Sequence, residues 1–153
     1  PSLAYKNYLK RLKMKYVRFP MSINNSYSKI PLAAILQTIP RSGLKWFLFH
    51  FYGRAMSPLG MSVPEFEEFV HSSPGGIEMN WDELAALANG IIETYDCLVV
   101  AASPSMRPQK SDILQNNYTD CQIVINGFDS TDWTISAQDE QLLGKIATAF
   151  QNG

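Results

Sequence analysis

Residues 44–53, LKWFLFHFYG, constrain the fold of this chain more than any other stretch. Side chains alternate between the two faces of a strand. A regular strand would place Leu44, Trp46, Leu48, His50 and Tyr52 on one face and Phe47, Phe49 and Phe51 on the other. Because both faces are mainly apolar, both must be covered. We therefore predict a central strand of a sheet with other parts of the chain packed on each side.

The size and composition of the chain favour one globular domain. Its 153 residues are enough to bury a core without metal or disulfide, and its 46% apolar and 18% charged residues argue against extensive disorder. Cys97 and Cys121 form neither a disulfide framework nor a zinc-binding pattern, so we predict no disulfide between them, no metal and a reducing, cytoplasmic setting. The apolar runs are much shorter than the ~20 residues of a membrane helix, and we recognise no export signal, so no membrane association is expected.

The first thirteen residues admit two interpretations. The chain begins at Pro1, and Met14 is followed by KYVRFPM, whose alternation predicts a first strand. Residues 1–13 are therefore either a non-native remnant or a helical N-terminal extension capped by Ser2. The helical alternative rests on the spacing of Tyr5, Tyr8, Leu9, Leu12 and Tyr16. Residues 14–153 are expected to form a single domain under both interpretations.

Periodicity along the remaining chain predicts the element order β-α-β-α-α-β-β-β-α. The expected strands cover residues 14–19, 44–53, 96–102, 120–127 and 133–136, and the expected helices cover 29–39, 62–70, 80–95 and 137–150. Hairpins next to helices favour the α+β class, with helices packed on a mainly antiparallel sheet. Residues 103–119 carry two prolines and are expected to form a long loop with one helical turn at SDIL.

Two of the expected helices begin with capping-box spacing. Ser62 precedes Glu65 by three residues, and Asn80 precedes Glu83 by three. The sequence leaves two possible ends for the second of these helices, because Gly90 either lies within it or terminates it.

Charge is divided unequally along the chain. Residues 1–64 hold ten Lys and Arg and no acid, whereas residues 65–153 hold three Lys and Arg and fourteen Asp and Glu, which gives +10 and −11. Two interpretations follow: either the two parts attract one another within the fold, or one of them serves a partner of opposite charge.

No motif in the sequence predicts catalysis. Phosphate-binding, dinucleotide-binding and zinc-protease patterns are absent, so we predict no catalytic residue, cofactor or metal. A pairing of Cys97 with His50 or His71 is disfavoured, because Cys97 lies in an apolar strand where a thiol acts as a small hydrophobe. Nucleic-acid binding by the basic run 6–18 is disfavoured too, because the acidic remainder would repel phosphates.

Residues 127–133, GFDSTDW, place two acids and a tryptophan between two apolar runs. Asp129 and Ser130 favour a turn because their short side chains bond to nearby backbone amides, and Gly127 tolerates a positive φ. Trp133 would then begin the returning strand at the edge of the core. We interpret the segment as a hairpin turn that needs no function to explain it.

The same segment carries a family resemblance. Residues 123–150, IVINGFDSTDWTISAQDEQLLGKIATAF, resemble the C-terminal end of small bacterial α+β proteins that include immunity proteins of polymorphic and contact-dependent toxin systems. There, a strand ends in the pattern Asp-x-Ser/Thr-x-Trp, here Asp129, Thr131 and Trp133, and a strand and an amphipathic helix follow. The resemblance implies a protein that binds a cognate toxin domain, and such proteins are commonly acidic when the toxin is a basic nuclease.

We therefore expect a non-enzymatic, cytosolic binding protein of bacterial type, and specifically an immunity protein whose partner is a basic toxin domain. The alternatives are a small enzyme of unrecognised type and an adaptor or structural subunit. The expected partner-binding residues are seven acids and one aromatic: Glu65, Glu67, Glu68, Asp82, Glu83, Asp129, Asp132 and Trp133.

The two-sided apolar strand makes a testable prediction about backbone protection. Amide hydrogen exchange is expected to be slowest in residues 44–53 and 97–102, because buried strands open only with the whole domain. Exchange at residues 47–51 as fast as in residues 103–119 would contradict the prediction. The measurement is native-state exchange followed by NMR or mass spectrometry.

Overall fold

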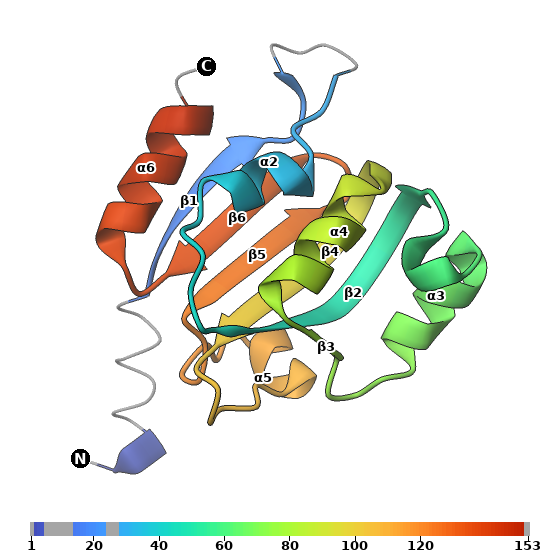
Figure 1. The fold of residues 1–153 in the computed structure, drawn as a ribbon. Coiled ribbons are helices and arrows are strands. Elements are labelled where there is room, and N and C mark those ends of the chain that lie inside the picture. The colour runs from blue at the N-terminus through green and yellow to red at the C-terminus, as the bar shows by residue number, and fades with distance from the viewer. Residues whose placement is uncertain (1, 5–13, 24–27, 152–153) are drawn as a thin grey trace.

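The computed structural model describes residues 2–4, 14–23 and 28–151. Residues 5–13, on which the two interpretations of the N-terminus depend, lie outside this part. The described chain forms one antiparallel sheet of six strands in the order β1-β6-β5-β4-β2-β3. The strands are β1 (Lys15–Pro20), β2 (Lys45–Ala55), β3 (Ile77–Met79), β4 (Ile91–Ala102), β5 (Ile123–Phe128) and β6 (Asp132–Ala137). Five helices pack against it, so the predicted α+β class is confirmed (Figure 1).

The helices divide between the two faces and one edge of the sheet. They are α2 (Leu32–Gln37), α3 (Val63–His71), α4 (Trp81–Asn89), α5 (Lys110–Leu114) and α6 (Glu140–Phe150). Buried side chains of α2, α4 and α6 join the larger apolar cluster on the first face, whereas Ile113 of α5 belongs to a smaller cluster on the second face. Helix α3 lies along the outer half of β2 (Figure 1). Each face of the sheet therefore has its own core.

The two predicted helix starts are confirmed. The Ser62 hydroxyl accepts the Glu65 N–H at 3.3 Å and donates to Glu65 Oε1 at 2.8 Å. At α4 the capping is reciprocal: Asn80 Oδ1 accepts the Glu83 N–H at 2.8 Å, and Glu83 Oε1 accepts the Asn80 N–H at 3.0 Å. Glu65 and Glu83 therefore have structural roles at helix ends, where a negative charge is also favoured by the helix dipole.

Several element boundaries differ from the prediction, most of all around Gly90. Of the two readings of Gly90, the one in which it ends the helix is correct: α4 stops at Asn89, and β4 runs from Ile91 to Ala102. The strand begins so early because Ile91, Ile92 and Thr94 are β-branched and favour extended backbone. Strand β3 was missed, since its three residues are too few to show alternation.

Strand β2 is covered on both faces, but it is not central. It is the fifth strand of the sheet, next to the edge strand β3. Strand β3 pairs with only three of its residues, from Trp46 opposite Met79 to Leu48 opposite Ile77. A β-bulge at Phe49 also breaks the predicted alternation, because Leu48 pairs with Val99 and His50 with Leu98. As a result Phe51 joins Trp46 and Leu48 in the first core, and His50 turns to the second face.

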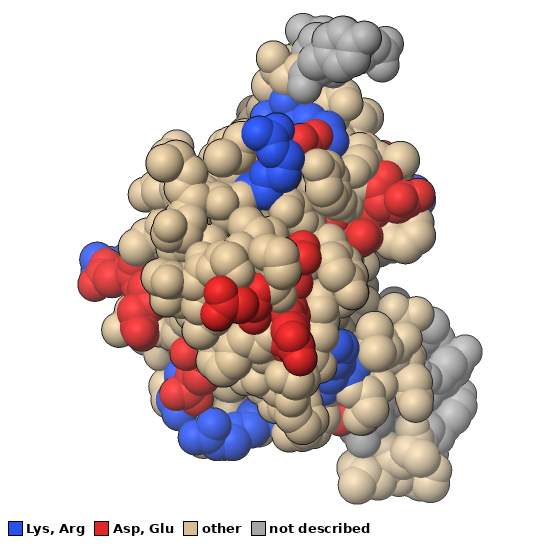
Figure 2. All heavy atoms as spheres, turned by 90° about the vertical axis from the view of Figure 1, so that its right-hand side faces the viewer, with Lys and Arg blue, Asp and Glu red and all other residues tan. Residues whose placement is uncertain are grey.

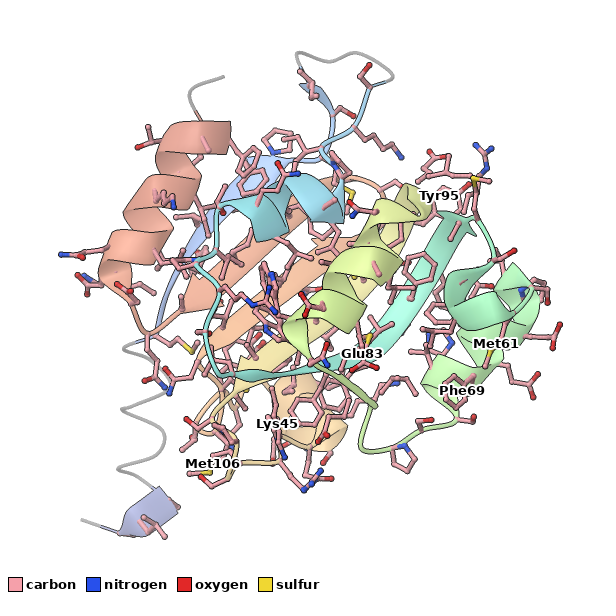
Figure 3. The ribbon with its side chains drawn as sticks, viewed as in Figure 1. Lys45, Met61, Phe69, Glu83, Tyr95 and Met106 are labelled. Atoms are coloured by element: carbon pink, nitrogen blue, oxygen red, sulfur yellow. The ribbon has the colours of Figure 1, made fainter. Side chains whose placement is uncertain are left out.

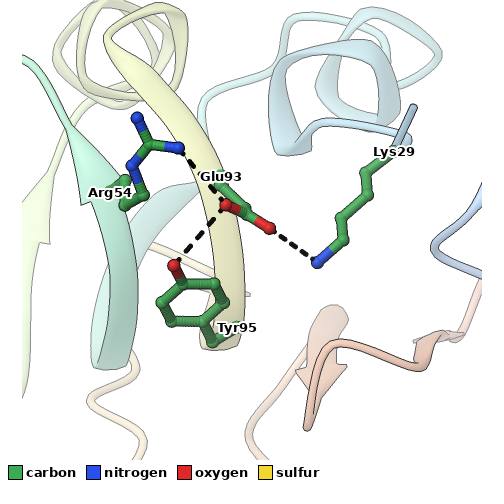
Figure 4. Close-up of polar contacts among 4 residues, drawn as sticks. All are labelled: Lys29, Arg54, Glu93 and Tyr95. Atoms are coloured by element: carbon green, nitrogen blue, oxygen red, sulfur yellow. Dashed lines mark hydrogen bonds and ion pairs between the residues drawn. The ribbon is translucent and has the colours of Figure 1, made fainter. Parts of the chain in front are cut away.

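The unequal charge division is largely used inside the fold. Six ion pairs join a base from residues 14–64 to an acid from residues 65–153: Lys15–Glu140, Arg18–Asp132, Lys29–Glu93, Arg41–Asp82, Lys45–Glu78 and Arg54–Glu93. Glu93 lies between Lys29 and Arg54, and its pKa is lowered, chiefly by the Lys29 hydrogen bond (Figure 4). Every Lys and Arg described in residues 14–64 thus has an acidic partner, which supports the intramolecular interpretation.

A close contact in the first core involves Gly127 and Trp133, which pair across β5 and β6. The Trp133 ring is fully buried, and its Nε1–H donates to the Ile30 carbonyl at 3.0 Å. A Cβ at position 127 would lie 2.8 Å from Trp133 Cζ3 and 2.7 Å from Met21 Cε. Glycine is therefore required so that the indole can lie across the strand.

Gly127→Ala is expected to lower the free energy of unfolding by about 1–3 kcal/mol, because the added methyl group overpacks a rigid buried ring. The matched control is Gly144→Ala on α6, where a Cβ meets nothing within 4 Å. That variant is expected to stabilise the domain by about 0.5–1 kcal/mol, since alanine favours a helix over glycine. Chemical denaturation measures both, and equal effects of the two substitutions would contradict the packing argument.

Candidate functional site

The residues expected at an interface lie in three separate places. Glu65, Glu67 and Glu68 lie on α3, and Figure 2, which views the side that carries this helix, shows acidic side chains gathered over it. Asp82 and Glu83 lie in the first turn of α4, in front of the sheet in Figure 3, whereas Phe69 marks α3 at the edge. The remaining three residues belong to the β5–β6 hairpin. A single surface does not include all of them.

Several of these acids already serve the fold. Glu65 and Glu83 take part in helix caps, Asp82 pairs with Arg41 at 2.6 Å, and Asp132 pairs with Arg18 at 2.9 Å. Glu68 is exposed, and its carboxylate forms no ion pair with any described residue. Among the acids of α3, Glu68 is therefore the one whose charge has no role in the fold.

The segment GFDSTDW is a tight hairpin, as its sequence indicates. Asp129 and Ser130 have φ of 50° and 60°, and the Thr131 N–H donates to the Phe128 carbonyl at 2.9 Å, which is the pattern of a two-residue turn with positive φ at both positions. The Asp129 N–H donates to Asp96 Oδ1 at 2.9 Å, which fastens the turn to β4. Trp133 is fully buried in the first core, so its place in the predicted interface is wrong for this fold.

Helix α3 completes the open edge of β2. Beyond β3, two backbone amides of β2 have no strand partner among the described residues, and side chains of α3 accept their hydrogen bonds instead. His71 Nε2 accepts from the Phe51 N–H, and Glu67 Oε2 accepts from the Gly53 N–H, both at 3.3 Å. The spacing of four residues places both acceptors on one side of the helix. Glu67 therefore satisfies a backbone amide at the sheet edge, where unpaired amides could otherwise pair with a strand of another chain.

The rings of His50, His71 and Tyr52 contact one another at tilted or edge-on angles where α3 meets the second face of the sheet, and we call this group the histidine cluster. The ring centroids of His50 and His71 are 4.6 Å apart, and those of Tyr52 and His71 are 4.5 Å apart. Burial lowers the pKa of both histidines; the positive charge of Lys110 adds to this, and His71 lowers the pKa of His50 further. Both imidazoles are therefore held in the neutral form near pH 7.

A groove of about 290 Å³ opens beside the histidine cluster on the second face. His50, Asp96, Leu98 and Asn126 line its floor from β2, β4 and β5, and α5 with the following loop lines its wall. The polar side chains are those of His50, Asp96, Lys110, Asn116, Tyr118 and Asn126. The groove could not be recognised from the sequence, because its residues come from four separate segments and residues 103–119 have only loop character there.

Cys97 and His50 do not form a nucleophilic pair. Cys97 pairs with Phe51 in the register and belongs to the first core, whereas His50 pairs with Leu98 on the opposite face. Both cysteines are free and buried, and burial raises the pKa of each thiol to about 12, so neither is a thiolate at neutral pH. Within residues 2–4, 14–23 and 28–151, no group of three or more His, Cys, Asp or Glu side chains could hold a metal ion.

A second exposed feature lies beside α3, in residues 56–61. Ser57 and Leu59 have φ of 43° and 50°, and Gly60 has φ of 75°. A positive φ is unfavourable for a branched residue such as leucine, and such strain is found most often at functional sites. The Leu59 side chain is 48% exposed, and Met56 at the start of the loop is 74% exposed.

Comparisons with known proteins do not assign the chain to a group. No protein-family model matches it, and no curated protein or solved structure does so either. No helix of the described residues has both the length and the apolar character that crossing a membrane requires.

The histidine cluster predicts a loss of stability on mild acidification. In the unfolded chain each imidazole regains a pKa near 6.5, whereas in the folded chain the pKa is lower. The unfolded state therefore binds more protons, and the stability present above pH 6.5 is lost as the pH falls below that value. Protonated His71 would also lose the acceptor for the Phe51 N–H. Tm measured from pH 7.5 to 5.5 is expected to fall.

His71→Gln is the matched variant for this prediction. The glutamine oxygen can still accept the Phe51 N–H, but the side chain does not titrate. Its Tm is expected to depend less steeply on pH over the same interval, in which carboxylates change charge little. Identical slopes of Tm against pH for the two proteins would show that the histidine cluster does not control the acid response.

Proposed function

We propose that this chain is a protein-binding domain, and specifically an immunity protein that neutralises a bacterial toxin domain by direct binding. The supporting observation is a surface made by residues 56–61 and the outward side of α3, here called the α3 surface. It combines exposed apolar side chains with carboxylates that form no ion pair with the described residues. The resemblance of residues 123–150 to immunity proteins supports the more specific part of the proposal.

The apolar part of the α3 surface has the properties of a binding anchor. Leu59 and Met56 project from one loop, and Phe69 of α3 is 39% exposed. The short 3-10 turn Pro58–Gly60 packs against α3, which keeps the loop and the helix together. A strained, packed loop presents its side chains at a low entropic cost on binding, which is the property of a preorganised interface.

The charged part of the α3 surface specifies the kind of partner. Glu65, Glu67 and Glu68 give α3 three carboxylates, whereas every described base in residues 14–64 is paired with an acid elsewhere. The carboxylates of α3 form no ion pair with the described residues, and Figure 2 shows acidic side chains gathered on this side of the molecule. Such negative charge favours a basic partner and accelerates association at low salt.

The proposal predicts the binding behaviour of two variants. The partner would be obtained by affinity capture from the native cell or from the adjacent gene, and its association rate measured across a salt series. Replacing Glu65, Glu67 and Glu68 together with glutamine is expected to slow association roughly tenfold at low salt and to flatten its salt dependence. Glutamine keeps the acceptor that Glu67 offers to the Gly53 N–H, so the fold should be retained.

Leu59→Asn tests the apolar anchor independently. Asparagine tolerates the left-handed backbone at this position better than leucine, so the variant should fold with unchanged or higher stability. Binding is expected to weaken roughly tenfold or more through faster dissociation. The control is Leu114→Asn, which changes an exposed leucine of α5 and should leave binding intact. Wild-type binding by both the triple variant and Leu59→Asn, or capture of no basic partner, would refute the proposal.

A further inference from the structure

The groove on the second face has the composition of a ligand site. Its floor continues a row of paired residues across the sheet, with His50 opposite Leu98 and Leu98 opposite Asn126. Apolar contact comes from Leu98, Ile113, Leu114 and Phe128, and the last two are well exposed. Neutral hydrogen-bonding groups come from His50, Asn116, Tyr118 and Asn126. Few convergent polar groups within an apolar lining are typical of a small-molecule site.

Two opposite charges face this groove without neutralising each other. Lys110 is partly buried and forms no ion pair or side-chain hydrogen bond with the described residues, yet its charge lowers the pKa of both His50 and His71. Asp96 forms no ion pair with Lys110, and among the described residues its carboxylate has one hydrogen-bond donor, the Asp129 N–H, which donates to Oδ1. A bound molecule that supplies an anion to Lys110 and a cation to Asp96 would satisfy both.

We propose that the groove between α5 and the second face binds a small zwitterion of amino-acid size with an apolar side chain. Its carboxylate would pair with Lys110, its ammonium group with Asp96, and its side chain would pack on Leu114 and Phe128. The inference is independent of the proposed protein partner, because the groove and the α3 surface are built from different residues.

The size and charge of the groove exclude larger or polyanionic ligands from this proposal. A volume of about 290 Å³ is at the lower limit of ligand pockets, which suits a molecule of about a dozen heavy atoms. Asp96 would repel a phosphate dianion, so a phosphate ester gains from Lys110 what it loses at Asp96. A ligand this small is expected to bind with a dissociation constant of about 1 mM.

The test is an NMR titration with three related probes: L-phenylalanine, 3-phenylpropionate, which lacks the ammonium group, and phenethylamine, which lacks the carboxylate. L-Phenylalanine is expected to shift the side-chain amide signals of Asn116 and Asn126, which line the groove. Each of the other two probes is expected to bind about fivefold more weakly, since each loses one partly screened ion pair.

Two variants assign the charges. Lys110→Gln is expected to weaken L-phenylalanine about fivefold and to leave phenethylamine unchanged, whereas Asp96→Asn should weaken L-phenylalanine and leave 3-phenylpropionate unchanged or tighter. Asparagine keeps an acceptor for the Asp129 N–H, so the hairpin is retained. Lys145→Gln on α6 is the control and should change nothing. The proposal is overturned if L-phenylalanine leaves the groove signals unshifted, if all three probes bind equally, or if inorganic phosphate binds more tightly than L-phenylalanine.

Discussion

Burial of both faces of the β2–β4 pair is the constraint on which the rest of the structure depends. Cys97, Val99 and Ala101 face the first core, and Leu98, Val100 and Ala102 face the second. Two separate layers are therefore required: α2, α4 and α6, with Phe66 and Val70 of α3, supply the first, and α5 with its long connection supplies the second. Because α5 is a single short helix, the described residues cover the second face only in part. The uncovered part of that face is where His50, Asp96 and Asn126 form the floor of a groove.

The partial partner of β2 determines the position of α3. Strand β3 pairs with only three residues of β2, so the amides of Phe51 and Gly53 need other acceptors. His71 and Glu67 supply them, and this explains why an acidic helix lies at the sheet edge instead of on a face. The same contact brings His71 against His50 and Tyr52. Glu67, which the sequence suggests as a partner-binding residue, thus has a structural role.

The charge pattern shows how composition can suggest a partner that the fold itself provides. Ion pairs between residues 14–64 and 65–153 account for each described base of the first part. Singly, exposed pairs contribute little to stability. The charged side chains that have no ion pair with the described residues are the more informative ones: the carboxylates of α3 beside Leu59, and Lys110 and Asp96 in the groove. Unpaired charge next to apolar surface is a more selective indicator of binding than net charge.

The sequence by itself determined the caps at Ser62 and Asn80 and the turn at Asp129 and Ser130, because each depends on interactions within a few residues. It also determined the α+β class and the two-sided strand, because the spacing of apolar residues shows which faces of an element must be buried. The bulge at Phe49, the three-residue β3 and the burial of Trp133 were decided by pairing and packing between distant segments. The groove belongs to this second group, since His50, Asp96, Lys110 and Asn126 lie on four elements separated along the chain. Periodicity reports which face of an element is apolar, but only the tertiary structure decides which polar side chains meet, because sheet register and helix placement are set by contacts that span the whole chain.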